Sequence, residues 1–206
     1  MPNFYNKYVL PKVTNALCST GPNMKQRQKV IPLASGRVLE IGVGSGLNFP
    51  YYNKDKVDHL LALDPSEEMW ALAKEKLIKL DISCDFIQAY AENIPVESNS
   101  IDAIVITYTL CSIPEYQAAM EEFRRVLKPD GTIIFCEHGA APDASVRRWQ
   151  NIINPVWKRL GGGCNLNRDI PKIISDGGFN FSNLETMYIP GPKIACYNYW
   201  GTATPI

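Results

Sequence analysis

Five short apolar runs, separated by helical patterns, constrain the fold of this chain more than any other feature. The runs cover residues 37–41, 60–63, 83–88, 101–106 and 131–137. They are rich in Val, Ile and Leu and nearly continuous, which is typical of strands buried on both faces of a parallel sheet. Strands that alternate with helices along the chain predict a doubly wound α/β fold.

Helices are predicted between these runs. Apolar residues recur with a 3.6-residue period in residues 66–80 and again in residues 115–127. The sequence K-P-D-G at residues 128–131 is predicted to stop the second helix in a turn. A hairpin around Pro190-Gly191-Pro192 is expected to join the last two strands.

Composition excludes several classes of function. The 21 Lys and Arg residues balance 21 Asp and Glu residues, so there is no basic excess to attract nucleic acid. No apolar run approaches the roughly 18 residues needed to cross a bilayer. The first residues lack the pattern of a signal peptide. These features predict a cytoplasmic protein without integral membrane association; they leave the oligomeric state open.

The six cysteines are expected to be buried thiols. Neighbouring cysteines are at least 25 residues apart, so the chain has no C-x-x-C pair and no zinc-binding spacing. Several, such as Cys136, have apolar neighbours, and a buried thiol behaves as a small hydrophobic side chain. No metal site is predicted.

A glycine-rich turn, E-I-G-V-G-S-G, follows the first predicted strand at residues 40–46. A dinucleotide fingerprint, G-x-G-x-x-G, would need glycine at position 47, which is Leu47. A Walker phosphate loop would need a lysine after Gly46, and none is present. The turn therefore differs from both phosphate-binding motifs, although its position at the end of a strand still favours a ligand site.

Asp64 ends the second strand, 22 residues after Gly42. An acid at that position is placed to accept hydrogen bonds from ribose hydroxyls. A second interpretation is a helix cap, with Asp64 before Pro65 and Glu67 three residues later. Ribose binding is favoured, and both interpretations stay open.

Five ordered segments resemble the motifs of class I S-adenosylmethionine-dependent methyltransferases, in the methyltransferase type 11 group. They are E-I-G-V-G-S-G, L-D-P-S-E-E-M, A-Y-A-E-N-I-P, I-D-A-I-V-I and V-L-K-P-D-G-T. The resemblance implies S-adenosylmethionine as the cofactor. It also implies a Rossmann-like, mainly parallel seven-stranded sheet with an antiparallel C-terminal strand, N-terminal helices and a helical insertion after strand five.

By position, the resemblance implies a set of cofactor-binding residues. The set comprises Glu40, Gly42, Gly44, Gly46, Asp64, Pro65, Met69, Ala91, Glu92 and Thr107. The glycines would admit the methionine part, Asp64 would hold the ribose, and Met69 would pack on adenine. Tyr90 stands where the family often has Asp, so packing and backbone contacts are expected to replace a carboxylate. Met69 could equally be a core residue.

The second half narrows the resemblance to the microsomal alkyl-thiol methyltransferases. Glu137-His138, N-P-V-W-K at 154–158 and G-G-C-N-L-N-R-D at 162–169 carry it. Those proteins have an N-terminal membrane anchor, which this chain is expected to lack. We expect one domain over residues 1–206, with a helical lid (1–35), a cofactor-binding core (36–138), a helical insertion on the substrate side (139–178) and C-terminal strands (179–206).

Candidates for the acceptor side are few. His138, at the end of the fifth strand, is the candidate general base, and a structural histidine bonded within the loop is the alternative. Tyr5, Tyr8, Trp149 and Arg168 are candidate substrate contacts. Packing is the favoured alternative for Tyr5 and Tyr8, and a surface ion pair is an equal alternative for Arg168. Trp149 belongs to a helical stripe with Ile153, Trp157 and Leu160, and such a stripe is more often part of a core than of a binding site. The glycine run 161–163 could be a helix end or a hinge.

The combined reading predicts an enzyme that methylates a small molecule, with a thiol as the leading acceptor. Transfer from a sulfonium is an in-line displacement, for which the protein aligns the two reactants and excludes water. The alternatives are a peripheral lipid- or quinone-type methyltransferase and a nicotinamide-dependent oxidoreductase. The oxidoreductase is disfavoured by Leu47 and by the lack of a Tyr-x-x-x-Lys pair.

Overall fold

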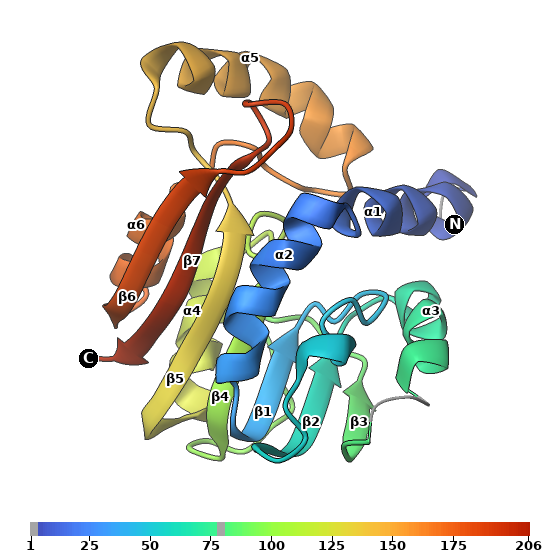
Figure 1. Cartoon of the computed structure of the whole chain (residues 1–206), viewed down its shortest axis with the longest axis vertical. Helices are drawn as coiled ribbons and strands as arrows, with labels where there is room; N and C mark the ends of the chain where they lie inside the picture. The colour runs from blue at the N-terminus through green and yellow to red at the C-terminus, as the bar shows by residue number, and fades with distance from the viewer. Residues whose placement is uncertain (1–3, 78–80) are drawn as a thin grey trace.

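A computed structural model describes residues 4–77 and 81–206, and within these ranges seven strands form one mixed sheet (Figure 1). The strand order is β3-β2-β1-β4-β5-β7-β6. β1 to β5 are parallel, and β7 is antiparallel to both of its neighbours. The strands are β1 (Gly36–Ile41), β2 (Val57–Leu63), β3 (Cys84–Ile87), β4 (Ile101–Thr107), β5 (Leu127–His138), β6 (Phe179–Tyr188) and β7 (Tyr197–Pro205). This confirms the predicted doubly wound, seven-stranded α/β fold.

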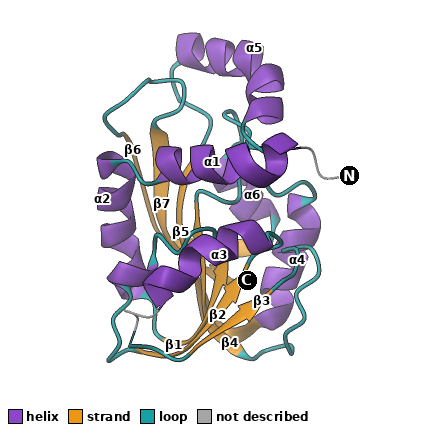
Figure 2. Cartoon of the chain, turned by 90° about the vertical axis from the view of Figure 1, so that its right-hand side faces the viewer, coloured by secondary structure: helices purple, strands orange, loops and turns teal. Residues whose placement is uncertain are grey.

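Helices cover both faces of the sheet, and two more lie across its end (Figures 1 and 2). α2 and α3 pack on one face, α4 and α6 on the other, and α1 and α5 lie beyond the carboxyl ends of the parallel strands. The described helices are α1 (Leu10–Cys18), α2 (Gly21–Val30), α3 (Glu67–Leu77), α4 (Tyr116–Val126), α5 (Ala144–Leu160) and α6 (Ile170–Asp176). Short helical turns occupy η1 (Tyr5–Val9), η2 (Ile31–Leu33) and η3 (Phe49–Tyr51).

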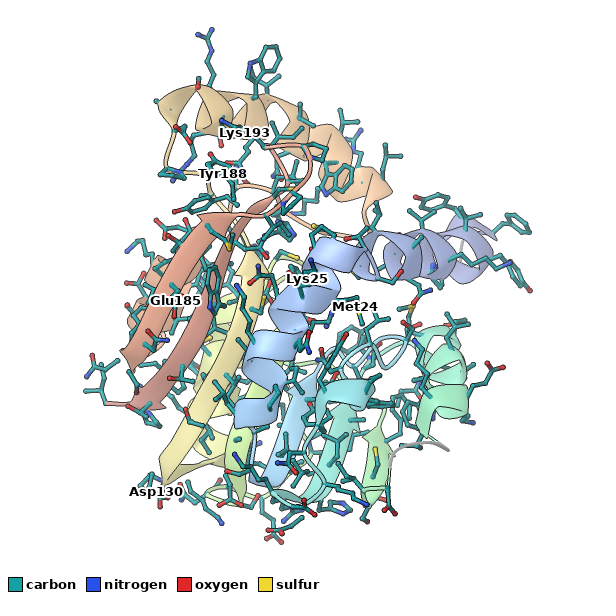
Figure 3. All side chains as sticks on the ribbon, in the orientation of Figure 1. Met24, Lys25, Asp130, Glu185, Tyr188 and Lys193 are labelled. Atoms are coloured by element: carbon teal, nitrogen blue, oxygen red, sulfur yellow. The ribbon has the colours of Figure 1, made fainter. Side chains whose placement is uncertain are left out.

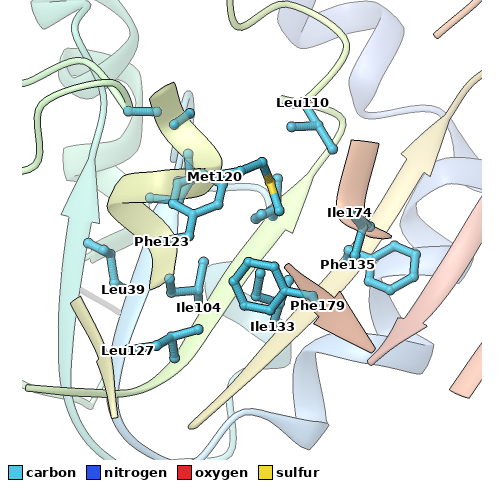
Figure 4. Packing of buried hydrophobic residues seen from close by; sticks show 14 of the residues in the cluster. Leu39, Ile104, Leu110, Met120, Phe123, Leu127, Ile133, Phe135, Ile174 and Phe179 are labelled. Atoms are coloured by element: carbon cyan, nitrogen blue, oxygen red, sulfur yellow. The ribbon is translucent and has the colours of Figure 1, made fainter. Parts of the chain in front are cut away.

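The core has two layers because strand side chains alternate between the faces of the sheet. In β4, Ile104 and Ile106 join the layer under α4 and α6, whereas Ala103 and Val105 join the layer under α2 and α3. Figure 4 shows how Phe123 and other side chains of the first layer pack together. Near-continuous apolar runs were therefore a reliable sign of strands buried on both faces.

One boundary differs from the sequence-based expectation. The helix expected at 66–80 corresponds to α3 (Glu67–Leu77), and the expected residues 78–80 lie outside the described residues. The helix expected at 115–127 ends at Val126, as the Pro-Gly stop signal predicted, but 128–131 belong to β5. These four residues form a bulge, because Leu127 pairs with Ile101 and Thr132 already pairs with Ala103. Lys128 Nζ lies 2.5 Å from Asp102 Oδ1 and ties the bulge to β4.

β6 and β7 form the expected C-terminal hairpin, joined by residues 189–196 around Gly191. This connection lies against α5, where Gln150 Nε2 donates to the Ile194 carbonyl at 3.0 Å. Figure 3 shows Tyr188 and Lys193 at this point. In β7, Gly201 has a φ of 155°, and a Cβ there would lie 2.0 Å from the Asn183 carbonyl oxygen. The close approach of β6 to β7 therefore requires glycine.

Removing the ring of Phe123 is expected to destabilise the protein strongly. Its side chain is fully buried between α4 and the sheet, so Phe123→Ala leaves a cavity. We expect the free energy of unfolding in urea to fall by about 3–5 kcal/mol. Leu33→Ala, at a side chain that is 53% exposed, is the control and should change it by less than about 1 kcal/mol. Equal losses in both variants would contradict the assigned core.

Candidate functional site

A pocket of about 650 Å³ opens where β1, β2 and β4 end, a size typical of small-molecule sites. It lies at the point where the strand order reverses between β1 and β4, which is where open α/β sheets bind ligands. The residues that line it from the sheet side include Ile41, Gly42, Gly44, Leu63, Asp64, Met69, Ala91, Glu92 and Thr107. α1 and the turn after α5 close the opposite wall through residues such as Leu10, Pro11, Cys18, Gly162 and Gly163.

The glycine turn after β1 forms the floor of this pocket. Gly42, Gly44 and Gly46 all have positive φ values, between 53° and 68°. A Cβ on Gly42 would lie 2.4 Å from the Thr109 side chain, so this glycine allows close packing between two loops. A Cβ on Gly44 would meet little beyond Met69 Cε at 3.2 Å. Gly44 therefore leaves its backbone open to a ligand, whereas Gly46 packs on Phe49 and does not line the pocket.

Asp64 joins the glycine turn to the end of β2. Its Oδ2 accepts the Gly44 N–H at 2.8 Å, and its Oδ1 accepts the Ser66 N–H at 2.9 Å. Burial raises the pKa of Asp64, and these two backbone donors act in the opposite direction. The Ser66 hydroxyl accepts the Met69 N–H, so Ser66 caps α3 and Asp64 does not. The rival interpretation of Asp64 as the helix cap is therefore not needed.

A buried polar network lies beneath the turn. Glu40 accepts hydrogen bonds from Asn48 Nδ2 at 2.9 Å and from the Tyr52 hydroxyl at 2.7 Å. Arg27 Nη1 donates to Asn48 Oδ1 at 2.7 Å and to Thr107 Oγ1 at 2.5 Å. Burial raises the pKa of Glu40 to about 7, although its hydrogen bonds and the Arg27 charge lower it. Glu40 does not line the pocket; its partner Asn48 contacts Arg27 and Thr107, which do.

Sequence reasoning missed Arg27, which lines the pocket from α2 and lies 5.0 Å from the centre of the Tyr108 ring. α2 is mostly polar, and its sequence does not by itself separate the buried Arg27 from the exposed Lys25 and Lys29. Only the packing of α2 on the sheet, where it contacts β5 and β7, selects this cation.

The predicted residues around the adenine position come together. Pro65, Met69, Ala91 and Glu92 all line the pocket, as does Thr107 at the end of β4. Tyr90, in the position often held by Asp in the family, lines the rim with 65% of its surface exposed.

The four predicted substrate contacts lie outside the pocket lining. The Tyr5 hydroxyl donates to the Leu160 carbonyl at 2.6 Å, and Tyr8 is half exposed. Trp149 lies on the outer face of α5 and is 57% exposed. Arg168 donates to the Leu110 carbonyl and lies 5.0 Å from the centre of the Tyr116 ring, so its side chain makes contacts within the protein.

His138 is partly buried behind the pocket wall and does not line it. Its Nε2 lies 3.2 Å from Cys164 Sγ, in the turn that follows α5. This glycine-rich turn ends the helix through N–H groups of Gly161 and Gly163 that donate to α5 carbonyls. The neighbouring Glu137 carboxylate accepts the N–H groups of Thr109 and Leu110 at 2.7 and 3.0 Å. Glu137 therefore holds the turn after β4 instead of orienting His138.

The sequence profile of the methyltransferase domain family matches residues 39–135. Human thiol S-methyltransferase TMT1B is 31% identical over 182 residues, which cover 85% of this chain and 73% of that protein. The chain belongs to the S-adenosylmethionine-dependent methyltransferases. Rat TMT1B is 33% identical over 153 residues, and the chain spans 62% of its length. A demethylmenaquinone methyltransferase of Clavibacter sepedonicus is 32% identical over 139 residues, which cover 66% of this chain and 56% of that protein.

Solved structures share the fold. A SAM-dependent methyltransferase of Methanosarcina mazei superposes with a TM-score of 0.67 at 17% identity and covers 82% of this chain and 92% of its own. A SAM-dependent methyltransferase of Leishmania major gives 0.71 at 16% identity, with 96% and 79% covered.

The family resemblance inferred from the five ordered motifs is therefore confirmed. S-adenosylmethionine is the cofactor of this methyltransferase family.

Replacing Glu40 with Gln is expected to remove a pH dependence of stability. The folded-state pKa of Glu40, about 7, is above its ordinary value of 4.5, so the folded protein holds a proton that the unfolded chain releases. The difference in free energy of unfolding between the parent protein and Glu40→Gln should therefore change with pH: the parent protein loses stability relative to the variant as pH rises from about 4.5 to 7. The total change is on the order of a few kcal/mol. Urea unfolding of both proteins across this range measures it, and a constant difference would contradict the burial effect.

Proposed function

We propose that this protein transfers a methyl group from S-adenosylmethionine to a small thiol. The observation that carries the proposal is the arrangement of Asp64 and Gly44, which offers an acceptor carboxylate and an open glycine backbone side by side in one pocket. Thiol S-methyltransferases among the relatives favour a sulfur acceptor.

The pocket residues fit the cofactor. A carboxylate has about four lone-pair positions, and the two backbone hydrogen bonds to Asp64 leave others for the ribose hydroxyls. Gly44 would lie against the methionine part, and Met69 with Ala91 would pack on the adenine. Glu92 and Thr107 complete the wall around these groups. Gly42, Gly46 and Glu40 would act indirectly, by fixing the turn and its supporting network.

When bound, the cofactor supplies an electrophilic methyl group on a sulfonium. The chain then has two tasks, which are to align the acceptor sulfur with that methyl group and to exclude water. Leu10, Pro11, Ile113 and Pro114 form an apolar wall, the acceptor wall, on the side where the acceptor would enter. A thiol has an ordinary pKa of about 8.5, so little base strength is needed. His138 as the base stays a prediction, and its burial behind the wall does not favour direct contact with the acceptor.

Asp64→Asn is expected to weaken cofactor binding about 10–100-fold, because hydrogen bonds to a charged group contribute about 1.5–3 kcal/mol each. Isothermal titration calorimetry with S-adenosylmethionine measures the change. Asp102→Asn is the matched control, because Asp102 lies at the opposite end of the strands beside Lys128. An unchanged affinity in Asp64→Asn would remove Asp64 from the site.

The acceptor class is tested by incubating the protein with S-adenosylmethionine and a short alkyl thiol, with a phenol and a quinol in parallel. Mass spectrometry should detect the methyl thioether and S-adenosylhomocysteine in equal amounts. Asp64→Asn should make less product at limiting cofactor. Cofactor binding without any product from the thiol would overturn the thiol assignment.

A second candidate function is methylation of an acceptor dissolved in an anionic bilayer. Charge is strongly segregated in this chain, since residues 1–39 and 144–168 hold eleven of the 21 cations and none of the 21 acids. These segments contain η1, α1, α2 and α5, and both α1 and the turn after α5 border the pocket. Within residues 4–77 and 81–206, no helix is long and apolar enough to cross a membrane.

The same end of the molecule exposes apolar side chains. One stripe of α5 is more than half exposed and consists of Trp149, Ile152, Val156 and Leu160. Phe4, Tyr8 and Leu17 are also exposed on the N-terminal helices, which contact the end of α5 through Tyr5 and Leu10. The expected core stripe on this helix is therefore wrong for Trp149 and Leu160. Apolar side chains flanked by cations are typical of helices that lie in a bilayer interface, and quinone methyltransferases are among the relatives.

Under this second candidate function, the protein should sediment with vesicles that contain phosphatidylserine and much less with pure phosphatidylcholine vesicles. Binding should weaken as salt rises, because salt screens the attraction of cations to anionic lipid. Trp149→Ala with Val156→Ala should lower the bound fraction, whereas Leu184→Ala, at an exposed position on β6, should not. Equal binding to both vesicle types, or none to either, would remove this candidate.

A further inference from the structure

The cluster of interest consists of Cys111, His138 and Cys164, three residues that lie behind the acceptor wall of the pocket. Their ligand atoms, two Sγ atoms and one imidazole nitrogen, all lie within 4.8 Å of one another. Cys164 Sγ is 3.2 Å from His138 Nε2 and contacts the Cys111 thiol. Cys111 is buried, and the other two residues are partly buried. We propose that these three side chains bind one zinc ion.

The spacing of the ligand atoms suits zinc. Tetrahedral zinc has Zn–S distances of about 2.3 Å and Zn–N distances of about 2.0–2.1 Å, which place neighbouring ligand atoms roughly 3.5–3.8 Å apart. The cluster is within about 1 Å of that arrangement and needs only small side-chain movements. Two thiolates would balance the charge of the ion, and a mixed sulfur and imidazole set favours zinc over magnesium or calcium.

The surrounding hydrogen bonds hold the loops that carry the ligands. Asn165, next to Cys164, donates both its backbone N–H and its Nδ2 to the Cys111 carbonyl, at 3.0 and 2.9 Å. Asn154 on α5 fixes this loop by donating to Asn165 Oδ1 and by accepting the Leu166 N–H. The Glu137 carboxylate fixes the turn that precedes Cys111. Metal sites depend on such support for their ligand geometry.

Three protein ligands leave a fourth tetrahedral position, as in catalytic zinc sites that use two cysteines and one histidine. The pocket reaches the cluster from both loops, because Ser112 follows Cys111, Gly163 precedes Cys164, and both line the wall. A Cβ on Gly163 would meet only the Ser112 carbonyl, at 3.4 Å, within 4 Å. The open wall between the two loops is where an acceptor could reach the ion.

The fourth position would bind the acceptor sulfur, a step that rests on the proposed thiol function. A coordinated thiol loses its proton, which passes to water, and becomes a thiolate. The thiolate then forms the new S–C bond. The bond between that methyl carbon and the donor sulfur breaks, and its electron pair stays on the donor sulfur. Nothing is oxidised or reduced.

Zinc binding is tested on the whole protein under a reductant that contains no thiol. Chelator-treated protein is dialysed against Zn²⁺, and bound metal is measured by atomic emission. We expect one zinc per chain in the parent protein. Loss of an outer-shell partner lowers metal affinity about 10–100-fold. Loss of a ligand in Cys111→Ser, Cys164→Ser or His138→Asn should lower zinc affinity by more than that. Cys84→Ser and Cys196→Ser, at thiols outside the cluster, should bind zinc as the parent protein does.

Co²⁺ substitution gives a readout independent of turnover. The parent protein should show thiolate-to-cobalt charge-transfer absorption and intense tetrahedral bands, which the three cluster variants lose. Calorimetry should show unchanged affinity of those variants for S-adenosylmethionine, because none of the three cluster residues lines the pocket. This result confirms that the variants fold. Absence of zinc from the reduced parent protein, or equal binding in all variants, would overturn the metal site.

The acceptor part has its own outcome. Adding a short alkyl thiol to the Co²⁺ protein should change the charge-transfer absorption, and removing zinc should lower thiol methylation without changing cofactor affinity. An unchanged spectrum would overturn acceptor binding at the ion. Thiol methylation by a metal-free protein at the parent rate would overturn acceptor binding at the ion, while the proposed function stands. Zinc binding without any thiol methylation would overturn the proposed function, while the metal site stands.

Discussion

The hydrogen bonds between Arg27, Asn48, Thr107 and Glu40 hold together the four segments that the pocket needs. Glu40 belongs to β1, Thr107 ends β4, Asn48 follows the glycine turn, and Arg27 reaches them from α2. All four are buried, so each polar group depends on the others for a partner. A buried group that loses its partner costs more than the hydrogen bond gained when both are present. The network therefore fixes the turn relative to both strands.

This network explains why Gly42 and Gly44 have different roles in the turn. Gly42 must approach Thr109 closely, so that the turns after β1 and β4 pack against each other. Gly44 is left with open space above its backbone, and the Asp64 carboxylate holds its N–H. Close packing below and open space above are both needed for a pocket at the end of a parallel sheet. A side chain at either position would remove one of the two.

The sequence predicted those parts of the molecule that depend on local order. Apolar runs identified the strands because burial on both faces leaves no alternation. Gly42, Asp64 and Thr107 meet around one pocket because parallel strands end at the same edge. Residues supplied by packing between distant elements could not be predicted. Arg27 resembles its exposed neighbours, and Trp149 faces solvent because Gln150, one position along α5, is the buried residue that holds three backbone carbonyls.

The acceptor side shows the same limit most clearly. Cys111, His138 and Cys164 are more than 25 residues apart along the chain, so no spacing rule connects them. They meet because β4 and β5 are neighbours and because Asn165 ties the turn after α5 to the turn after β4. Glu137 and His138 alternate across β5: Glu137 anchors the Cys111 turn, and His138 reaches the Cys164 thiol. One pair of adjacent residues therefore positions both cysteines of the cluster, and this makes the end of β5 the structural link between the cofactor core and the acceptor wall.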